Sequence, residues 1–269
     1  KGVPKAVREL TIPFAYNDIA AVHRLFDEHA GQIACVIMEP VTFSPPARGY
    51  LQEMKDLCHR HGALLVFDEV VTGFRLHLGG AQALLGVSPD LACFGKAMAN
   101  GFPLSALVGR SEVMRLLDDV FFSFTFGGDT MGLAACKATI HELRTHNVVG
   151  KQALVGQQLK DGIDQMLHDF HLNEQISCLG YPQWTTFNFK DTSGKPSQDI
   201  RSLFQQESLR RGVLTHGSHL LSYMHTAEVI EETLAIYRDV FSVLAEAIAG
   251  GNVRSRLMGD PIRPVFRQV

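Results

Sequence analysis

Two charged residues stand where apolar runs end, and their types could do chemistry together. Lys96 follows the apolar run of residues 91–94 and precedes a turn that contains Gly101 and Pro103. Asp68 follows a second apolar run, residues 63–67. A lysine at the end of a buried strand is poorly solvated, so its neutral, nucleophilic form is easier to reach. Such an amine can form a Schiff base with a carbonyl group.

The spacing of apolar residues predicts alternating strands and helices in the first part of the chain. The predicted strands cover residues 33–38, 63–67, 91–94 and 105–108. The predicted helices cover residues 17–30, 50–60, 130–146 and 151–170. This alternation indicates an α/β fold with a mostly parallel sheet up to about residue 150.

The pattern changes in the second part of the chain. Short strands are expected within residues 176–190 and 213–223, with helices over 198–211 and about 226–249. The helix over 151–170 is expected to bury one stripe, made of Leu154, Val155, Leu159, Ile163, Met166 and Phe170. The last helix is expected to bury Val229, Ile230, Leu234, Tyr237, Phe241, Leu244 and Ile248. We therefore predict a large domain over residues 1–150 and a smaller α+β domain over 151–269.

Composition and charge argue against several functions. The chain has 269 residues and a net charge of −3, so it has no basic footprint for nucleic acid. No apolar run approaches the length needed to span a membrane, and the first residues do not resemble a signal peptide. The five cysteines are scattered and form no Cys-x-x-Cys motif. Reduced thiols and a cytoplasmic setting are the expectation.

The strand ends predict where these residues meet. In open α/β sheets, ligands bind at the carboxyl ends of the strands. Glu39, Asp68 and Lys96 all fall at such ends and could converge on one pocket. A lysine for an aldehyde and a carboxylate for a pyridine nitrogen are what pyridoxal phosphate needs. The residues therefore favour that cofactor.

Four sequence stretches resemble class III aminotransferases in order and approximate spacing. They are Ile37-Met-Glu-Pro-Val41, Phe67-Asp-Glu-Val-Val-Thr-Gly-Phe-Arg75, Pro89-Asp-Leu-Ala-Cys-Phe-Gly-Lys96 and Phe124-Thr-Phe-Gly-Gly128. The separation of Asp68 and Lys96, 96 − 68 = 28 residues, is similar too. Leu78-Gly-Gly-Ala-Gln82 and Leu221-Ser-Tyr-Met-His-Thr226 resemble the branch of glutamate-1-semialdehyde 2,1-aminomutases.

The resemblance implies a fold, an activity and a role for each residue. The fold would be the type I fold of pyridoxal-phosphate-dependent transferases. Lys96 would carry the cofactor as a Schiff base and move a proton, and Asp68 would pair with the pyridinium nitrogen. Val70 would pack on the ring, and Thr125 would bind the cofactor's phosphate in the neighbouring subunit's site. A homodimer with shared active sites would transfer an amino group from an amino donor to a carbonyl acceptor.

The chain also departs from the family pattern. Ser44 replaces a glutamate that gates the substrate in relatives acting on ω-amino acids, and Val71 replaces a frequent glutamine. Gly127-Gly-Asp-Thr130 replaces the usual Ser-Gly-His/Asn-Pro. Relatives carry a long part before the position of Lys1, with a phosphate loop and an aromatic residue that stacks on the ring. Without that part, the expectation is half of a cofactor site and poor cofactor binding by this piece alone.

Several alternatives stay open from the sequence. Glu69 could be the functional acid in place of Asp68. His216, His219 and His225 could suggest a metal, but solvated or core histidines are the expectation. Arg75 and Arg110 could bind a substrate carboxylate, although salt bridges are the safer prediction. The activity could be aminotransfer, a 2,1-aminomutase reaction, or none, in a non-catalytic fragment or interaction module.

Overall fold

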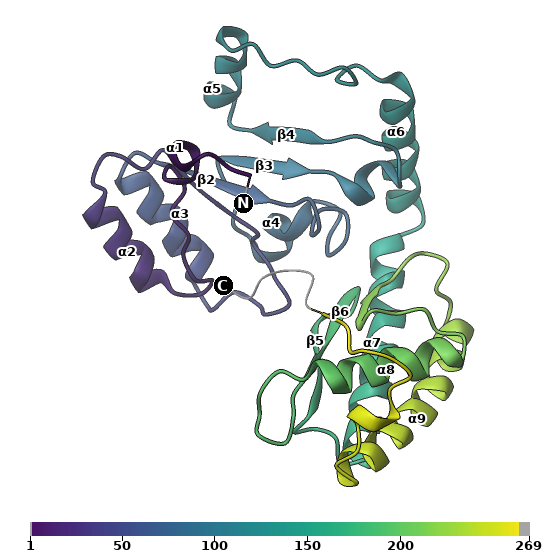
Figure 1. Cartoon of the computed structure of the whole chain (residues 1–269). Helices are drawn as coiled ribbons and strands as arrows, with labels where there is room; N and C mark the ends of the chain where they lie inside the picture. The colour runs from purple at the N-terminus through teal and green to yellow at the C-terminus, as the bar shows by residue number, and fades with distance from the viewer. Residues whose placement is uncertain (1, 264–269) are drawn as a thin grey trace. The chain divides into compact units, whose positions relative to one another are not determined.

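The computed structural model describes residues 2–263, which belong to two compact units that divide after Ile140 (Figure 1). Each unit has a hydrophobic core of its own. The assignment of residues 1–150 and 151–269 to a large and a small domain of the whole protein stays a prediction. No helix among the described residues is both long and apolar enough to cross a bilayer.

The first unit is built on a four-stranded sheet in the order β1-β2-β3-β4 (Figure 1). Its strands are β1 (Cys35–Met38), β2 (Leu64–Asp68), β3 (Leu91–Phe94) and β4 (Ala106–Gly109). The first three strands run parallel, and β4 pairs with β3 in the antiparallel direction. Apolar residues of α2 (Ile19–Glu28) and α3 (Tyr50–Arg60) pack with β1 and β2 in one core. The prediction of a mostly parallel α/β sheet is confirmed.

Several short helices of the first unit have no counterpart in the sequence prediction. They are α1 (Lys5–Arg8), α4 (Gly80–Leu85), α5 (Ser111–Met114), η1 (Lys96–Ala99) and η2 (Arg115–Asp119). They are too short to show an amphipathic period. The longer α6 (Thr130–Thr145) begins in the first unit and continues past its boundary.

Glu69 holds the start of α4 and is fully buried. Its carboxylate accepts hydrogen bonds from the backbone N–H groups of Ala81, at 2.7 Å, and Gln82, at 2.8 Å. It also accepts a short hydrogen bond from the Thr72 hydroxyl. The first N–H groups of a helix have no partner within it. The carboxylate accepts hydrogen bonds from these groups and interacts favourably with the positive end of the helix dipole.

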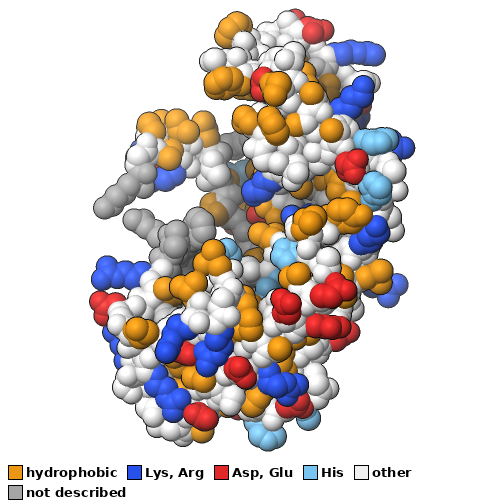
Figure 2. Space-filling view, turned by 90° about the vertical axis from the view of Figure 1, so that its right-hand side faces the viewer, with side chains coloured by type: hydrophobic (Ala, Val, Ile, Leu, Met, Phe, Trp, Pro, Cys, Tyr) orange, Lys and Arg blue, Asp and Glu red, His pale blue; other side chains and the backbone are white. Residues whose placement is uncertain are grey.

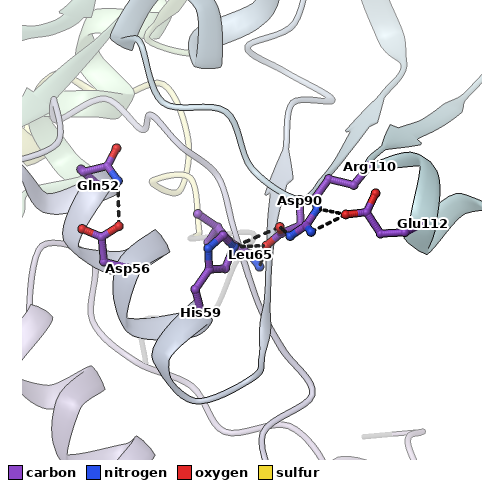
Figure 3. Close-up of polar contacts among 7 residues, drawn as sticks. All are labelled: Gln52, Asp56, His59, Leu65, Asp90, Arg110 and Glu112. Carbon is purple, nitrogen blue, oxygen red and sulfur yellow. Dashed lines mark hydrogen bonds and ion pairs between the residues drawn. The ribbon is translucent and has the colours of Figure 1, made fainter.

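Asp90 ties together the opposite end of the sheet, where β3 begins (Figure 3). Its carboxylate is 1% exposed and accepts from the Leu65 backbone N–H at 2.8 Å. It also accepts from Arg110 at 2.9 Å and lies 3.0 Å from His59 Nε2. Burial raises the pKa of Asp90, but the hydrogen bonds from Leu65, Arg110 and His59 outweigh burial and hold it below its usual value. Arg110 also pairs with Glu112, as the salt-bridge prediction for Arg110 expected.

The second unit packs three helices with a small antiparallel sheet of order β5-β6-β7. The strands are β5 (Ile176–Tyr181), β6 (Trp184–Phe189) and β7 (Ser218–Leu220). The helices are α7 (Val148–Asp169), α8 (Gln198–Arg210) and α9 (Ala227–Ala249), followed by the short η3 (Arg254–Arg256). Of the tail predicted as extended, residues 264–269 lie outside the described residues.

Two residues predicted to face inward are exposed. Leu154 on α7 is 74% exposed and Val229 on α9 is 38% exposed. The buried stripe of α7 instead runs through Val148, Gln152, Gly156, Leu159, Ile163, Met166 and Leu167. Leu154 was predicted to be buried because it is apolar. The packing of α7 on its neighbours instead buries Gln152 and Gly156.

His219 is a half-buried residue of the second unit whose ring lies between two hydroxyl groups. Its Nδ1 lies 2.8 Å from the Thr185 hydroxyl and its Nε2 lies 2.9 Å from the Tyr237 hydroxyl. Burial lowers the pKa of His219 to about 4, so the ring is neutral near pH 7. Within residues 2–263, no group of three or more His, Cys, Asp or Glu side chains could hold a metal ion.

Replacing Asp90 by asparagine tests the network at the start of β3. We expect the free energy of unfolding at pH 7 to fall by about 1–3 kcal/mol, because a buried charged acceptor with three partners is lost. The folded-state pKa of Asp90 is lowered, so its contribution is complete above about 3.9, the ordinary value, and disappears as the pH falls through the lowered pKa. Urea unfolding from pH 7 down to pH 3 measures this. A difference between the two proteins that stays constant over the whole range would contradict it.

Replacing Glu69 by glutamine tests the cap on α4. In either orientation the amide NH2 faces a backbone N–H, that of Ala81 or that of Gln82, so we expect a loss of about 1–3 kcal/mol. Glu28→Gln, an exposed change on α2, is the matched control and should stay within about 0.5 kcal/mol of the parent. Chemical unfolding of all three proteins decides. Equal effects of the two substitutions would remove Glu69 from its structural role.

Candidate active site

The register of three parallel strands brings Glu39, Asp68 and Lys96 to one edge of the sheet. Met38 pairs with Phe67, so Glu39 and Asp68 are the next residues along β1 and β2. Asp68 in turn pairs with Cys93 on β3, and the Glu69 N–H donates to the Cys93 carbonyl at 2.9 Å. Lys96 lies three residues beyond Cys93. The structure therefore places all three residues at the carboxyl ends of neighbouring strands, as the sequence predicted.

Asp68 retains an oxygen that can accept another donor. Its side chain is half-buried, and Oδ1 accepts from the Val70 N–H at 3.0 Å. No described residue donates a hydrogen bond to Oδ2. Glu69, the alternative acid, is fully buried and occupied by its three donors. Asp68 is thus the carboxylate of the pair that a ligand can reach.

Lys96 occupies an unusual backbone conformation. It is the first residue of η1 and has a φ of +43°, in the left-handed region that costs a residue with a side chain of order 1–3 kcal/mol. Its amine makes no hydrogen bond or ion pair with any residue in the described part of the chain. The expectation that Lys96 is poorly solvated is wrong for this chain, because its side chain is exposed. Lys96 lies in the turn that follows the end of β3, and its side chain is in contact with solvent.

The electrostatics of this edge show that the charges influence one another. Burial and, after it, the nearby charge of Asp68 raise the pKa of Glu39, and Lys96 acts in the opposite direction. Burial and the charge of Asp68 also raise the pKa of Cys93. An edge with two carboxylates favours a ligand that offers a positive charge to Asp68. The amine of Lys96, in its neutral form, can add to an electrophile.

Val70 and Thr125 have different surroundings. Val70 is half-buried, and its Cγ1 lies 3.6 Å from the point that a Cβ on Gly95 would occupy, so it sits over the residue before Lys96. Thr125 is exposed in a turn that the Gly127 N–H closes on the Phe124 carbonyl at 3.1 Å. The described contacts do not bring Thr125 to Asp68 or Lys96.

Sequence reasoning missed Cys93 as a neighbour of the candidate acid. The signal was available only once the strands were aligned, because the register pairs Cys93 with Asp68. Glu39 could be recognised as a strand-end acid, but its coupling to Asp68 required the parallel pairing of β1 and β2.

The chain resembles curated aminomutases over most of its length. It is 34% identical to a glutamate-1-semialdehyde 2,1-aminomutase from Sulfurihydrogenibium azorense, over 90% of this chain and 61% of that protein. It is 33% identical to the enzyme of the same name from Halorubrum lacusprofundi, over 89% of this chain and 63% of that protein. The chain thus spans about three fifths of the length of these relatives.

Solved structures share the fold. The PLP internal aldimine form of the FumI protein of Sphingopyxis sp. MTA144 superposes with a TM-score of 0.86 at 28% identity, covering 93% of this chain and 61% of that one. An omega-transaminase from Sphaerobacter thermophilus superposes with a TM-score of 0.82 at 23% identity, covering 90% of this chain and 59% of that one. The family model for class III aminotransferases matches residues 6–242. The chain belongs to the class III aminotransferase family.

Proposed function

We propose that this chain provides the lysine and the acid of a pyridoxal-phosphate-dependent aminotransferase. The observation that carries the proposal is the pairing of an amine without a protein partner, Lys96, with a carboxylate that has a free oxygen, Asp68, at adjacent strand ends. The family and the PLP-bound neighbours support the same cofactor. The donor set fits the group, because one residue can bond an aldehyde and the other can accept from a protonated pyridine nitrogen.

Each residue then has a task in the proposed reaction. Pyridoxal phosphate, when bound, supplies a ring that withdraws electrons from the substrate's α carbon. Asp68 would accept a hydrogen bond from the protonated ring nitrogen. Lys96 would hold the cofactor through its amine and would act as the general base that takes a proton from the substrate. Val70 would contact the ring.

The proposed partner is a second copy of the chain. Thr125 would act in the partner's site, where its hydroxyl and the N–H groups near Gly127 would bind phosphate. The surface around Thr125 supports this, because large apolar side chains there are exposed. They include Val120, Phe121, Phe122, Phe124, Phe126 and Met131, and Phe121 is 96% exposed. Orange apolar side chains are prominent in the upper part of Figure 2, which holds this segment. A patch of this kind marks an interface.

The proposed substrates are an amino donor and a carbonyl acceptor. The names of the curated relatives favour a second candidate, a 2,1-aminomutase reaction, in which the amine returns to another carbon of the same molecule. Rearrangement of glutamate-1-semialdehyde without a separate amino donor would select the aminomutase. A cytoplasmic setting is also proposed, and the five free cysteines support it. The presence of both Lys96 and Asp68 argues against a non-catalytic module.

The experiment is a visible absorbance spectrum of the full-length protein with added pyridoxal phosphate. We expect a band from lysine-bound cofactor that disappears in Lys96→Ala and stays in Lys137→Ala, an exposed lysine on α6. Asp68→Asn should keep the fold and lower the rate of amino transfer by roughly 10²–10³-fold, because a charge at the site of charge development is removed. If the parent protein shows no band, or Lys96→Ala keeps it, the proposed function is wrong.

A further inference from the structure

A cavity of about 350 Å³ lies in the second unit, between the start of α7 and the loop that leads into α9. The two helices lie side by side (Figure 1). The cavity is lined by Lys151, Gln152, Leu154 and Val155 of α7 and by Ser222, Tyr223, His225 and Thr226 of the loop. Its volume is at the lower end of the range for small-molecule sites. None of these residues takes part in the proposed reaction.

The two walls of this cavity are held in place by close packing. A Cβ on Gly156 of α7 would stand 2.1 Å from the Pro182 carbonyl oxygen and 3.0 Å from Leu221 Cδ1. Only glycine therefore allows the β5–β6 turn and Leu221 to rest on α7. The Leu221 N–H also donates to the Gln183 carbonyl at 3.2 Å. These contacts fix Leu221, the residue before the loop, beside Gly156. Gly156 lies one helical turn after Gln152 on α7.

The loop wall is also ordered by its own hydrogen bonds. The Ser222 N–H donates to His225 Nδ1 at 2.8 Å, and the Met224 N–H donates to the Ser222 hydroxyl at 3.3 Å. The Thr226 hydroxyl accepts from the Val229 N–H and caps α9. A cavity with walls ordered in this way is formed before a ligand arrives, which reduces the entropy lost on binding.

Gln152 is a polar residue at a buried position of α7 whose other buried residues are apolar or glycine. It lies on the buried stripe of α7, and only 8% of its surface is exposed. No described residue makes a hydrogen bond with its side-chain amide, and the amide atoms remain accessible to solvent. The amide lines the cavity, so a ligand there could supply both an acceptor and a donor.

The charge of the cavity comes from Lys151. Its Nζ donates to the Tyr223 hydroxyl at 2.9 Å and lies 5.0 Å from the centre of the Tyr223 ring. It forms no ion pair with a carboxylate of the described residues, and neither aspartate nor glutamate lines the cavity. Leu154, Val155 and the Tyr223 ring form the apolar part of the lining, beside Ser222, His225 and Thr226. The cavity thus combines a cationic rim, a buried amide and an apolar body.

We propose that this cavity binds a small carboxylate with an apolar body. The carboxylate would accept hydrogen bonds from Lys151 Nζ and the Gln152 amide NH2, and the apolar part would pack against Leu154, Val155 and the Tyr223 ring. A single carboxylate can accept a hydrogen bond from Lys151 and another from Gln152. An amine of the same shape would meet only repulsion from Lys151.

Calorimetric titration of the full-length protein with 4-phenylbutyrate tests the site, with 4-phenylbutylamine as the probe of opposite charge. The acid should bind saturably with one site per chain, and the amine should not bind. Lys151→Met keeps the length of the side chain and should weaken binding of the acid at least about tenfold, the size expected for loss of a charged hydrogen bond. Lys190→Met, an exposed lysine of the same unit, should leave the affinity unchanged.

Gln152→Leu separates a binding role from a structural one. Without ligand, this variant should have a melting temperature at least equal to that of the parent, because no hydrogen bond to a described residue is lost. Its affinity for 4-phenylbutyrate should nevertheless fall. The proposal is overturned if the acid does not saturate, if acid and amine bind equally, or if Lys151→Met and Gln152→Leu bind the acid as the parent does.

Discussion

The pairing of β2 with β3 is the interaction on which the candidate site depends. It sets Asp68 opposite Cys93, and so fixes how far Lys96 lies from Asp68. At the other end of the same pair, the buried Asp90 carboxylate accepts from the Leu65 N–H and from Arg110. A shift of one residue would turn every side chain of a strand to the other face. The hydrogen bonds of Asp90 at the start of β3 therefore help to fix the register that places Asp68 and Lys96 at the other end of the strand pair.

The two acids at the end of β2 have different surroundings. Glu69 is buried and satisfies the start of α4, whereas its neighbour Asp68 keeps one oxygen free. Strand alternation explains the difference, because successive side chains point to opposite faces. Lys96 adds backbone strain at the adjacent strand end. Strain of this kind persists where the surrounding structure holds it, often at functional sites.

The sequence was sufficient to predict that Asp68 and Lys96 lie at strand ends and that most of the sheet is parallel. Apolar runs that end in Asp68 and before Lys96 indicate strand ends, and alternating helices indicate a parallel sheet. The sequence could not show that Lys96 stands in an exposed turn or that Glu69 is a cap, since both depend on contacts with residues far along the chain. Leu154 was assigned to the core by its type, while Gln152 holds the buried position. Tertiary packing decides which of the two side chains is buried, and the spacing of apolar residues along the sequence does not reveal it.

The two units offer different kinds of binding site. The first presents charges at a sheet edge, and a separate segment around Thr125 exposes large apolar side chains. The second has a small cavity lined by one cation and by an amide without a hydrogen-bond partner among the described residues. Composition gave no sign of the cavity, because a lysine and a glutamine at the start of a helix usually face water.

We propose above that Lys96 bonds the cofactor. Borohydride reduction of the full-length protein with pyridoxal phosphate, followed by peptide mass mapping, identifies the lysine that does so. We expect a stable phosphopyridoxyl adduct on the peptide that contains Lys96 and no comparable adduct elsewhere. An adduct on a different lysine, or no adduct at all, would show that Lys96 does not have this role.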